Sequence, residues 1–166
     1  MHRTANEEEI EVNRMRQHIH IVTDGSAIGN PGPGGWAAVL SCGRNRWRIS
    51  GAAENTTVNE MELTAAIEAL KSIEIGSRVT LCSDSEYLIR GMRHLADRWL
   101  QQGWRNTRGR PLRDQNLWQN LLILRSNHFI EWQWVRGHNG HPRQTEADAL
   151  AYMEARREWL TQRLAA

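Results

Sequence analysis

The chain has 166 residues, of which 40% are hydrophobic and 24% are charged, and its net charge at pH 7 is +2. This length predicts a single compact domain, and this composition excludes a disordered or fibrous chain. The apolar runs are far shorter than a membrane span, the first residues lack the apolar region of a secretory signal, and neither cysteine lies in a C-x-x-C motif. We therefore expect a cytoplasmic protein with reduced thiols that does not contact a membrane.

Hydrophobic periodicity predicts an α/β fold. Residues 1–17 are polar and mixed in charge, and we expect a flexible N-terminal extension there, ahead of one domain over 18–166. The expected elements, in chain order, are strands over 18–23, 36–42 and 46–50, a helix over about 58–73, a strand over 78–83, helices over 85–102 (broken near Gly91) and 117–124, a strand over 130–135 and a helix over about 144–163. Hairpins mixed with crossovers predict one mixed sheet with helices on its faces.

Four acids form the strongest candidate site. Asp24 and Asp84 are each expected to end a strand, where side chains of α/β proteins converge on a ligand. Asp148 is expected in about the first turn of the last helix, and Glu62 lies on the first helix. Each acid alone is more often structural than catalytic, but convergent carboxylates repel one another unless a cation neutralises them. Carboxylate oxygens select Mg²⁺ or Mn²⁺, and two such ions activate water against a phosphodiester.

The start of the first helix decides where Glu62 points. Asn59 and Thr57 can each begin a helix with a capping box, because each is followed by a glutamate three residues later. If Thr57 is the cap, Glu60 is its partner and Glu62 is free to face the sheet.

Two loops are also candidates for function. The segment Gly29–Gly35 lacks the ending of a P-loop and precedes a strand, so a rigid turn is the alternative to a functional loop. The segment 136–143 carries His138 and His141. A zinc site there is weakly supported because no cysteine lies nearby, whereas a histidine beside an acid cluster can move protons near neutral pH.

A basic stretch lies between the second and third helical regions. Residues 98–113 hold five arginines and no acid, interleaved with Trp99 and Trp104. This pattern suits a nucleic-acid backbone, because guanidinium groups replace counterions at phosphates while indole rings pack on sugars or bases. A solvated amphipathic helix with both tryptophans in the core explains it equally well.

Taken together, the motifs resemble those of bacterial ribonuclease H type 1 from about residue 18 to the end of the last helix. The matching segments are Asp24-Gly-Ser, Gly29-Asn-Pro-Gly-Pro-Gly-Gly35, Asn59-Glu-Met-Glu-Leu63, Ser83-Asp-Ser85, Trp134-Val-Arg-Gly-His-Asn-Gly-His-Pro142 and Ala147-Asp148. The resemblance implies a ribonuclease H-like fold, a five-stranded mixed sheet flanked by helices. It implies a monomeric, Mg²⁺-dependent endonuclease that cuts the RNA strand of RNA–DNA hybrids and leaves 3′-hydroxyl and 5′-phosphate ends.

The resemblance also implies roles for individual residues. The metal-binding and catalytic carboxylates are Asp24, Glu62, Asp84 and Asp148, and His138 assists water activation or product release. The expected substrate-binding residues are Asn30 and Asn59 in the minor groove of the hybrid, Thr57 on a DNA phosphate, and Trp99, Trp104, Arg105, Arg108 and Arg110 in a basic protrusion that holds the DNA strand.

Several positions depart from the family pattern. They are Val58, Glu60, Glu86, Asp114 and residues 100–102, which are Leu, Gln and Gln. Most of them remove positive charge or add negative charge, so we expect weaker hybrid binding without loss of cleavage. Two alternatives are a hybrid-binding module without catalysis and a different nuclease of the same fold. The intact acid set disfavours the first, and the Gly-Pro loop with the basic stretch disfavours the second.

Overall fold

A computed structural model of the chain describes residues 18–137 and 142–166. The strands are β1 (His18–Ala27), β2 (Gly32–Cys42), β3 (Asn45–Thr56), β4 (Arg78–Ser83) and β5 (Phe129–Trp134). They form one sheet in the order β3-β2-β1-β4-β5, in which β1, β2 and β3 pair antiparallel and β1, β4 and β5 pair parallel. The expected five-stranded mixed sheet is confirmed.

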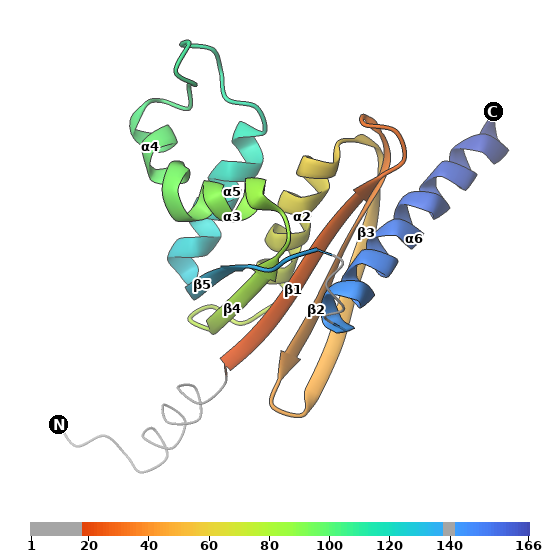
Figure 1. Cartoon of the computed structure of the whole chain (residues 1–166), viewed down its shortest axis with the longest axis horizontal. Coiled ribbons are helices and arrows are strands. Elements are labelled where there is room, and N and C mark those ends of the chain that lie inside the picture. The colour runs from red at the N-terminus through yellow and green to blue at the C-terminus, as the bar shows by residue number, and fades with distance from the viewer. Residues whose placement is uncertain (1–17, 138–141) are drawn as a thin grey trace.

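Helices cover both faces of this sheet (Figure 1). They are α2 (Val58–Lys71), α3 (Glu86–Arg90), the π-helical segment η1 (Gly91–Leu95), α4 (Ala96–Gln101), α5 (Gln115–Asn127) and α6 (Pro142–Ala165). The segments α2 to α5 lie on one face and α6 on the other. The π-helical turn from Gly91 confirms the break expected there. None of the described helices is long and apolar enough to cross a membrane.

Strand alternation divides the core between the two faces. Ile19 and Ile21 of β1 are buried in the main core with α2, whereas Val22 packs on the other side with Ala147 of α6. Asp24 shares the α6 side of β1 with Val22, because it lies two residues further along the strand. The Asp24 side chain therefore lies on the face of the sheet that α6 covers.

Three strands are longer than the sequence predicts, and the largest difference is in β3, which runs from Asn45 to Thr56 rather than over 46–50. β1 does not end at Asp24 but continues to Ala27, and β2 begins at Gly32, so both enter the loop expected over 25–35. The residues added to β1 and β2, mostly glycine, serine and alanine, pair with one another across the antiparallel ladder. The sequence does not predict these extensions, because the added residues lack the β-branched and aromatic side chains that indicate a strand.

Candidate functional site

A fork between two strands positions Asp24 and Asp84. β1 and β4 pair in parallel as far as Val22 and Cys82, after which β1 continues along β2 and β4 ends at Ser83. Asp24 lies just past the fork on β1, and Asp84 is the first residue after β4. Asp24 is thus inside a strand rather than at its end, but it is at the carboxyl end of the parallel ladder, where ligands of α/β proteins bind.

The cap of α2 directs Glu62 toward this fork. Thr57 is the N-cap: its Oγ1 accepts a hydrogen bond from the Glu60 backbone N–H at 3.2 Å, and its own N–H donates to Glu60 Oε2 at 2.7 Å. The expected capping box with Thr57 is confirmed, and Glu62 is left buried on the face that packs against β1. Gly25 permits this close packing, because a Cβ on it would lie 2.4 Å from the Glu62 backbone nitrogen.

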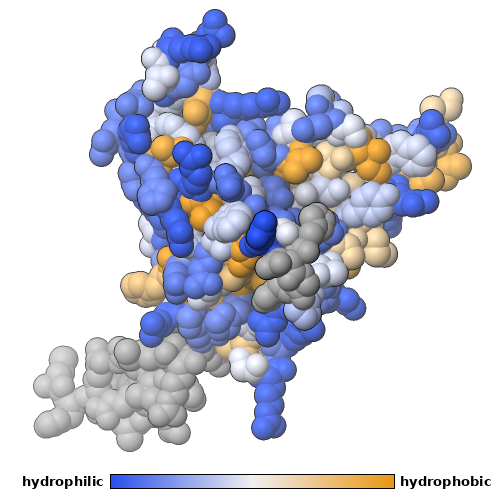
Figure 2. Space-filling model, viewed as in Figure 1, coloured by the Kyte–Doolittle hydropathy of each residue, from blue (hydrophilic) through white to orange (hydrophobic). Residues whose placement is uncertain are grey.

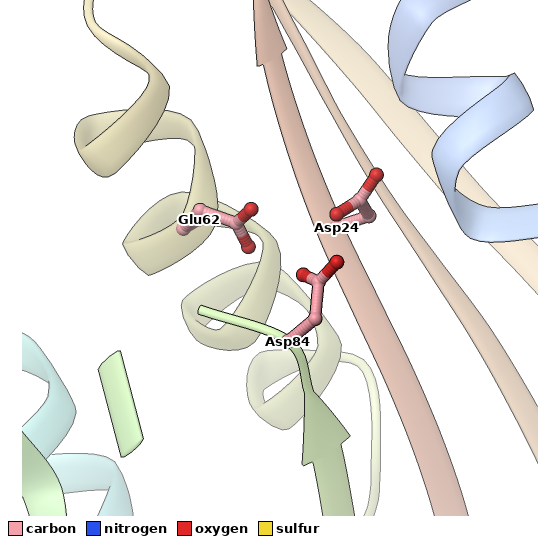
Figure 3. Close-up of side chains that lie close together, drawn as sticks. All are labelled: Asp24, Glu62 and Asp84. Atoms are coloured by element: carbon pink, nitrogen blue, oxygen red, sulfur yellow. The ribbon is translucent and has the colours of Figure 1, made fainter. Parts of the chain in front are cut away.

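Asp24, Glu62 and Asp84 form a three-acid cluster. Each offers a carboxylate oxygen, and these oxygens all lie within 4.8 Å of one another. The three side chains point toward one another from β1, from α2 and from the residue after β4 (Figure 3). Asp24 and Glu62 are each only 5% exposed, and Glu62 Oε2 is buried with no hydrogen-bond partner among the described residues. Buried carboxylate oxygens without partners are costly unless a ligand completes the site.

Burial and mutual repulsion hold protons on this cluster. Burial, with the charges of Asp84 and Asp148 and a hydrogen bond with Asp148, raises the pKa of Asp24 to about 8. Burial and the charges of Asp24 and Asp84 raise the pKa of Glu62 well above its ordinary value. A bound cation would offset both the cost of burying these charges and their mutual repulsion. An all-oxygen donor set fits a hard divalent ion such as Mg²⁺ or Mn²⁺.

Asp148 reaches the cluster from the opposite layer. α6 begins at Pro142, earlier than expected, so Asp148 lies in its second turn rather than its first. Its side chain interacts with Asp24 through charge and a hydrogen bond, although it is not one of the three acids within 4.8 Å. His138 and His141 fall outside the described residues, and the catalytic role expected of His138 stays a prediction.

The asparagines expected in the minor groove come together at one end of the sheet. Asn30 precedes β2, and its Oδ1 accepts a hydrogen bond from the Val58 backbone N–H at 3.2 Å. Asn59 is exposed one residue further along α2, while Thr57 is buried in its capping role. The backbone of Val58 thus links the two asparagine positions whatever its side chain.

The two tryptophans of the basic stretch are less exposed than expected for substrate-binding rings, since Trp104 is buried and Trp99 is half-buried. Trp104 is 7% exposed and belongs to the main core. Trp99 packs against that core, with its ring 5.0 Å from the Trp118 ring in an edge-on arrangement. The substrate contacts expected of Trp99 and Trp104 stay predictions, and the burial of the Trp104 ring leaves only its edge for such a contact. Both rings attach the basic stretch to the main core.

The arginines of this stretch are exposed on an arm, defined as residues 102–114 between α4 and α5. Arg105, Arg108 and Arg110 all face solvent. Asn106 shapes the tip, since its Oδ1 accepts hydrogen bonds from the backbone N–H groups of Arg108 and Arg110 at 2.9 and 3.1 Å. The surface of the arm is mostly hydrophilic (Figure 2, upper left).

A half-buried hydrogen-bond network that the sequence does not indicate fixes the base of the arm. Tyr87 Oη donates to Asp114 Oδ2 at 3.0 Å and accepts from Trp118 Nε1 at 3.2 Å. Burial leads the causes that raise the pKa of Tyr87 to about 12. The three residues come from α3, from the end of the arm and from α5, so no local sequence pattern connects them.

Comparison with known proteins agrees with this geometry. The family model described as RNase H matches residues 16–156. The chain is 46% identical over 133 residues to the ribonuclease H of Hahella chejuensis, covering 80% of this chain and 90% of that protein. It is 47% identical over 137 residues to the ribonuclease H of Polaromonas naphthalenivorans, covering 81% and 85% of the two chains.

A solved structure supports the same assignment. LC9-RNase H1, described as a type 1 RNase H with the type 2 active-site motif, superimposes with a TM-score of 0.78 at 31% identity, covering 86% of this chain and 74% of that one. Sequence and fold therefore agree over most of the molecule, and the chain belongs to the ribonuclease H family of enzymes.

Proposed function

We propose that this chain hydrolyses the RNA strand of RNA–DNA hybrids with two divalent metal ions, leaving 3′-hydroxyl and 5′-phosphate ends. The observation that carries the proposal is the buried three-acid cluster with Asp148 beside it, in a chain of this family. LC11-RNase H1, which shares the fold at 20% identity, has been solved in complex with an RNA/DNA hybrid.

The proposed metal ligands are Asp24, Glu62, Asp84 and Asp148, with Mg²⁺ as the ion and Mn²⁺ as an alternative. When bound, such ions activate a water molecule and stabilise the leaving oxygen of a phosphodiester. The four carboxylates are carried by two strands, β1 and the end of β4, and by two helices, α2 and α6. This framework fixes their spacing, so that little reorganisation is needed when the site fills. Asp24 and Glu62 release their protons when the metal ions bind.

His138 is proposed to carry a proton to or from this site. It follows Gly137, whose backbone lies against Asp84. An imidazole titrates near neutral pH, which suits proton transfer during hydrolysis or product release.

Substrate recognition is proposed to divide between two surfaces. Asn30 and Asn59 lie together and offer short polar side chains, which suit the detection of 2′-hydroxyls in the wide minor groove of a hybrid. Thr57 and the arm arginines 105, 108 and 110 are proposed to contact DNA phosphates, which add affinity without sequence preference.

The remaining proposals concern the whole molecule. We infer a monomer in the cytoplasm, consistent with two free cysteines, Cys42 and Cys82. We also retain the division into an extension over 1–17, which lies outside the described residues, and a catalytic domain over 18–166.

A substrate panel tests the function. The RNA strand of a hybrid is end-labelled and incubated with Mg²⁺ or with EDTA, beside single-stranded RNA, double-stranded RNA, double-stranded DNA and a branched DNA. We expect metal-dependent cutting of the hybrid RNA alone, with product ends that a ligase and a phosphatase identify as 3′-hydroxyl and 5′-phosphate. Tight hybrid binding without cutting would replace this function with that of a binding module, and cutting of branched DNA would indicate a different nuclease.

A further inference from the structure

Trp134, the last residue of β5, lies outside the core and makes one specific contact. Its side chain is 46% exposed, and it is absent from the main core that includes Trp132 of the same strand. Its Nε1 donates a hydrogen bond to the backbone oxygen of Asp84 at 3.1 Å. A large ring left half in solvent contributes little by burial, so the hydrogen bond is its specific interaction.

The residues around this contact join the ends of strands β4 and β5. Ser83 and Trp134 are the last pair of the parallel ladder between β4 and β5, and the Val135 backbone N–H donates to the Ser83 oxygen at 3.0 Å. The backbone oxygens of Ser83 and Asp84 therefore both accept hydrogen bonds from residues at the end of β5. Such ties restrict the direction in which the Asp84 side chain leaves the sheet.

Gly137 touches the carboxylate itself. A Cβ on Gly137 would lie 2.5 Å from Asp84 Oδ2, 3.4 Å from its Cγ and 3.5 Å from its Cβ, and these are the three nearest atoms. The φ angle of Gly137 is not in the left-handed region, so the backbone itself does not require glycine there. An added methyl group would meet the mobile end of one side chain and would turn that carboxylate rather than displace a strand.

We propose that Trp134 and Gly137 are positioning residues that set the Asp84 carboxylate in the three-acid cluster. Trp134 fixes the backbone of Asp84, and Gly137 leaves the space that its Oδ2 occupies. The inference rests on the proposed function, in which Asp84 is a metal ligand. Shifts of about 1 Å in such groups are enough to impair a site, and loss of contacts that orient ligands commonly costs 10- to 100-fold in metal affinity.

Metal binding to the metal-free protein, measured by calorimetry without substrate, tests this. We expect Trp134→Phe, which keeps an aromatic ring but loses the N–H donor, to weaken Mn²⁺ and Mg²⁺ binding by about 10-fold. Gly137→Ala should weaken it at least as much. The melting temperature in EDTA should change little for either variant, because neither change removes buried core.

Trp132→Phe is the matched control. Trp132 lies two residues away on the same strand, but it is buried in the core and its Nε1 has no hydrogen-bond partner among the described residues. We expect Trp132→Phe to lower the melting temperature and to leave metal affinity unchanged, the reverse of Trp134→Phe.

The outcomes separate this inference from the proposed function. If wild-type protein binds metal and cuts hybrid while Trp134→Phe and Gly137→Ala bind metal as tightly as wild type, the positioning role is wrong and the function stands. If wild-type protein neither binds metal nor cuts, the function itself fails. Should Gly137→Ala not fold, the comparison of Trp134→Phe with Trp132→Phe still decides the question.

Discussion

The three-acid cluster and the arm are built in opposite ways. The cluster is largely buried, and its acids come from β1, α2 and the end of β4, which meet only because the sheet and its helices pack together. The arm is exposed, and its arginines are arranged by hydrogen bonds among neighbours in sequence, such as those to Asn106. A region made by long-range packing holds groups at fixed distances, as chemistry requires, whereas a locally made, hydrated region supplies charge. The cluster should therefore control the rate and the arm the affinity.

The largest effect is expected from Asp84→Asn. This substitution removes a charged ligand from the cluster, and we expect the cleavage rate at saturating hybrid to fall by well over ~100-fold, beyond the loss of a contact that merely orients a ligand. Asp97→Asn is the control: Asp97 is an exposed acid on α4 that pairs with Arg125. Its loss should leave the rate unchanged. Near-normal cleavage by Asp84→Asn would mean that the acids are misassigned.

His138→Ala should cost less than Asp84→Asn under the same conditions, because water or a product phosphate can carry the proton instead. The comparison is made by single-turnover cleavage of a labelled hybrid. An equal loss in the two variants would make the histidine an obligatory participant.

Neutralising the arm should act on binding. Replacing Arg105, Arg108 and Arg110 with Gln is expected to raise the Kd for hybrid by about 10-fold or more at low salt, with little change in the rate at saturation. The slope of log affinity against log salt should become shallower by roughly two to three, because each phosphate contact contributes about 0.9. The same charge change on the exposed face of α6, with Arg156, Arg157 and Arg163 as Gln, is the control and should alter the slope less. Equal slopes in the two triple variants would remove the arm from substrate binding.

The raised pKa of Asp24 predicts how pH affects the metal-free protein. Because the pKa of Asp24 is about 8 in the folded state against an ordinary value of 3.8, the folded state binds more protons than the unfolded state between these pH values. Stability should therefore fall as pH rises from about 5 to 8, by at most about 1.4 kcal/mol per pH unit from this group. Melting curves in EDTA should show this slope, and added Mg²⁺ should reduce it. A metal-free protein that becomes more stable over this range would contradict the assignment.

The smallest effect concerns a departure from the family pattern. Asp114 and Glu60 both line a groove of about 620 Å³ between the start of α2 and the start of α5. Asp114→Asn keeps an acceptor for the Tyr87 hydroxyl and removes a negative charge, so hybrid affinity should rise by roughly twofold to threefold at low salt. Fluorescence anisotropy at two salt concentrations measures this, and an unchanged Kd would show that Asp114 lies away from the substrate path.

The sequence predicts what local patterns encode. The alternating hydrophobic pattern of residues 78–83 predicts a strand that ends just before Asp84. The pairing of Thr57 with Glu60 is one of two possible helix caps, and it is the one that leaves Glu62 facing the sheet. It could not predict that β1 passes Asp24, because that pairing depends on glycine and alanine backbone in β2.

Nor does the pattern of the basic stretch reveal that Trp104 is buried. The partners that enclose its ring are distant in sequence. An arginine-rich segment with tryptophans has the same sequence pattern whether the rings face the core or the solvent. The contact of Trp134 with the Asp84 backbone is likewise set by the register of two parallel strands.

Single-turnover cleavage of an RNA-labelled hybrid, with enzyme in saturating excess and with Mg²⁺ or EDTA, tests most directly the division between cluster and arm. Wild type, Asp84→Asn and the arm variant with three glutamines are compared. We expect EDTA to abolish cleavage, Asp84→Asn to leave the RNA essentially intact even when all of it is bound, and the arm variant to reach the wild-type rate. Cleavage by Asp84→Asn near the wild-type rate, or an arm variant that stays slow at saturation, would contradict that division.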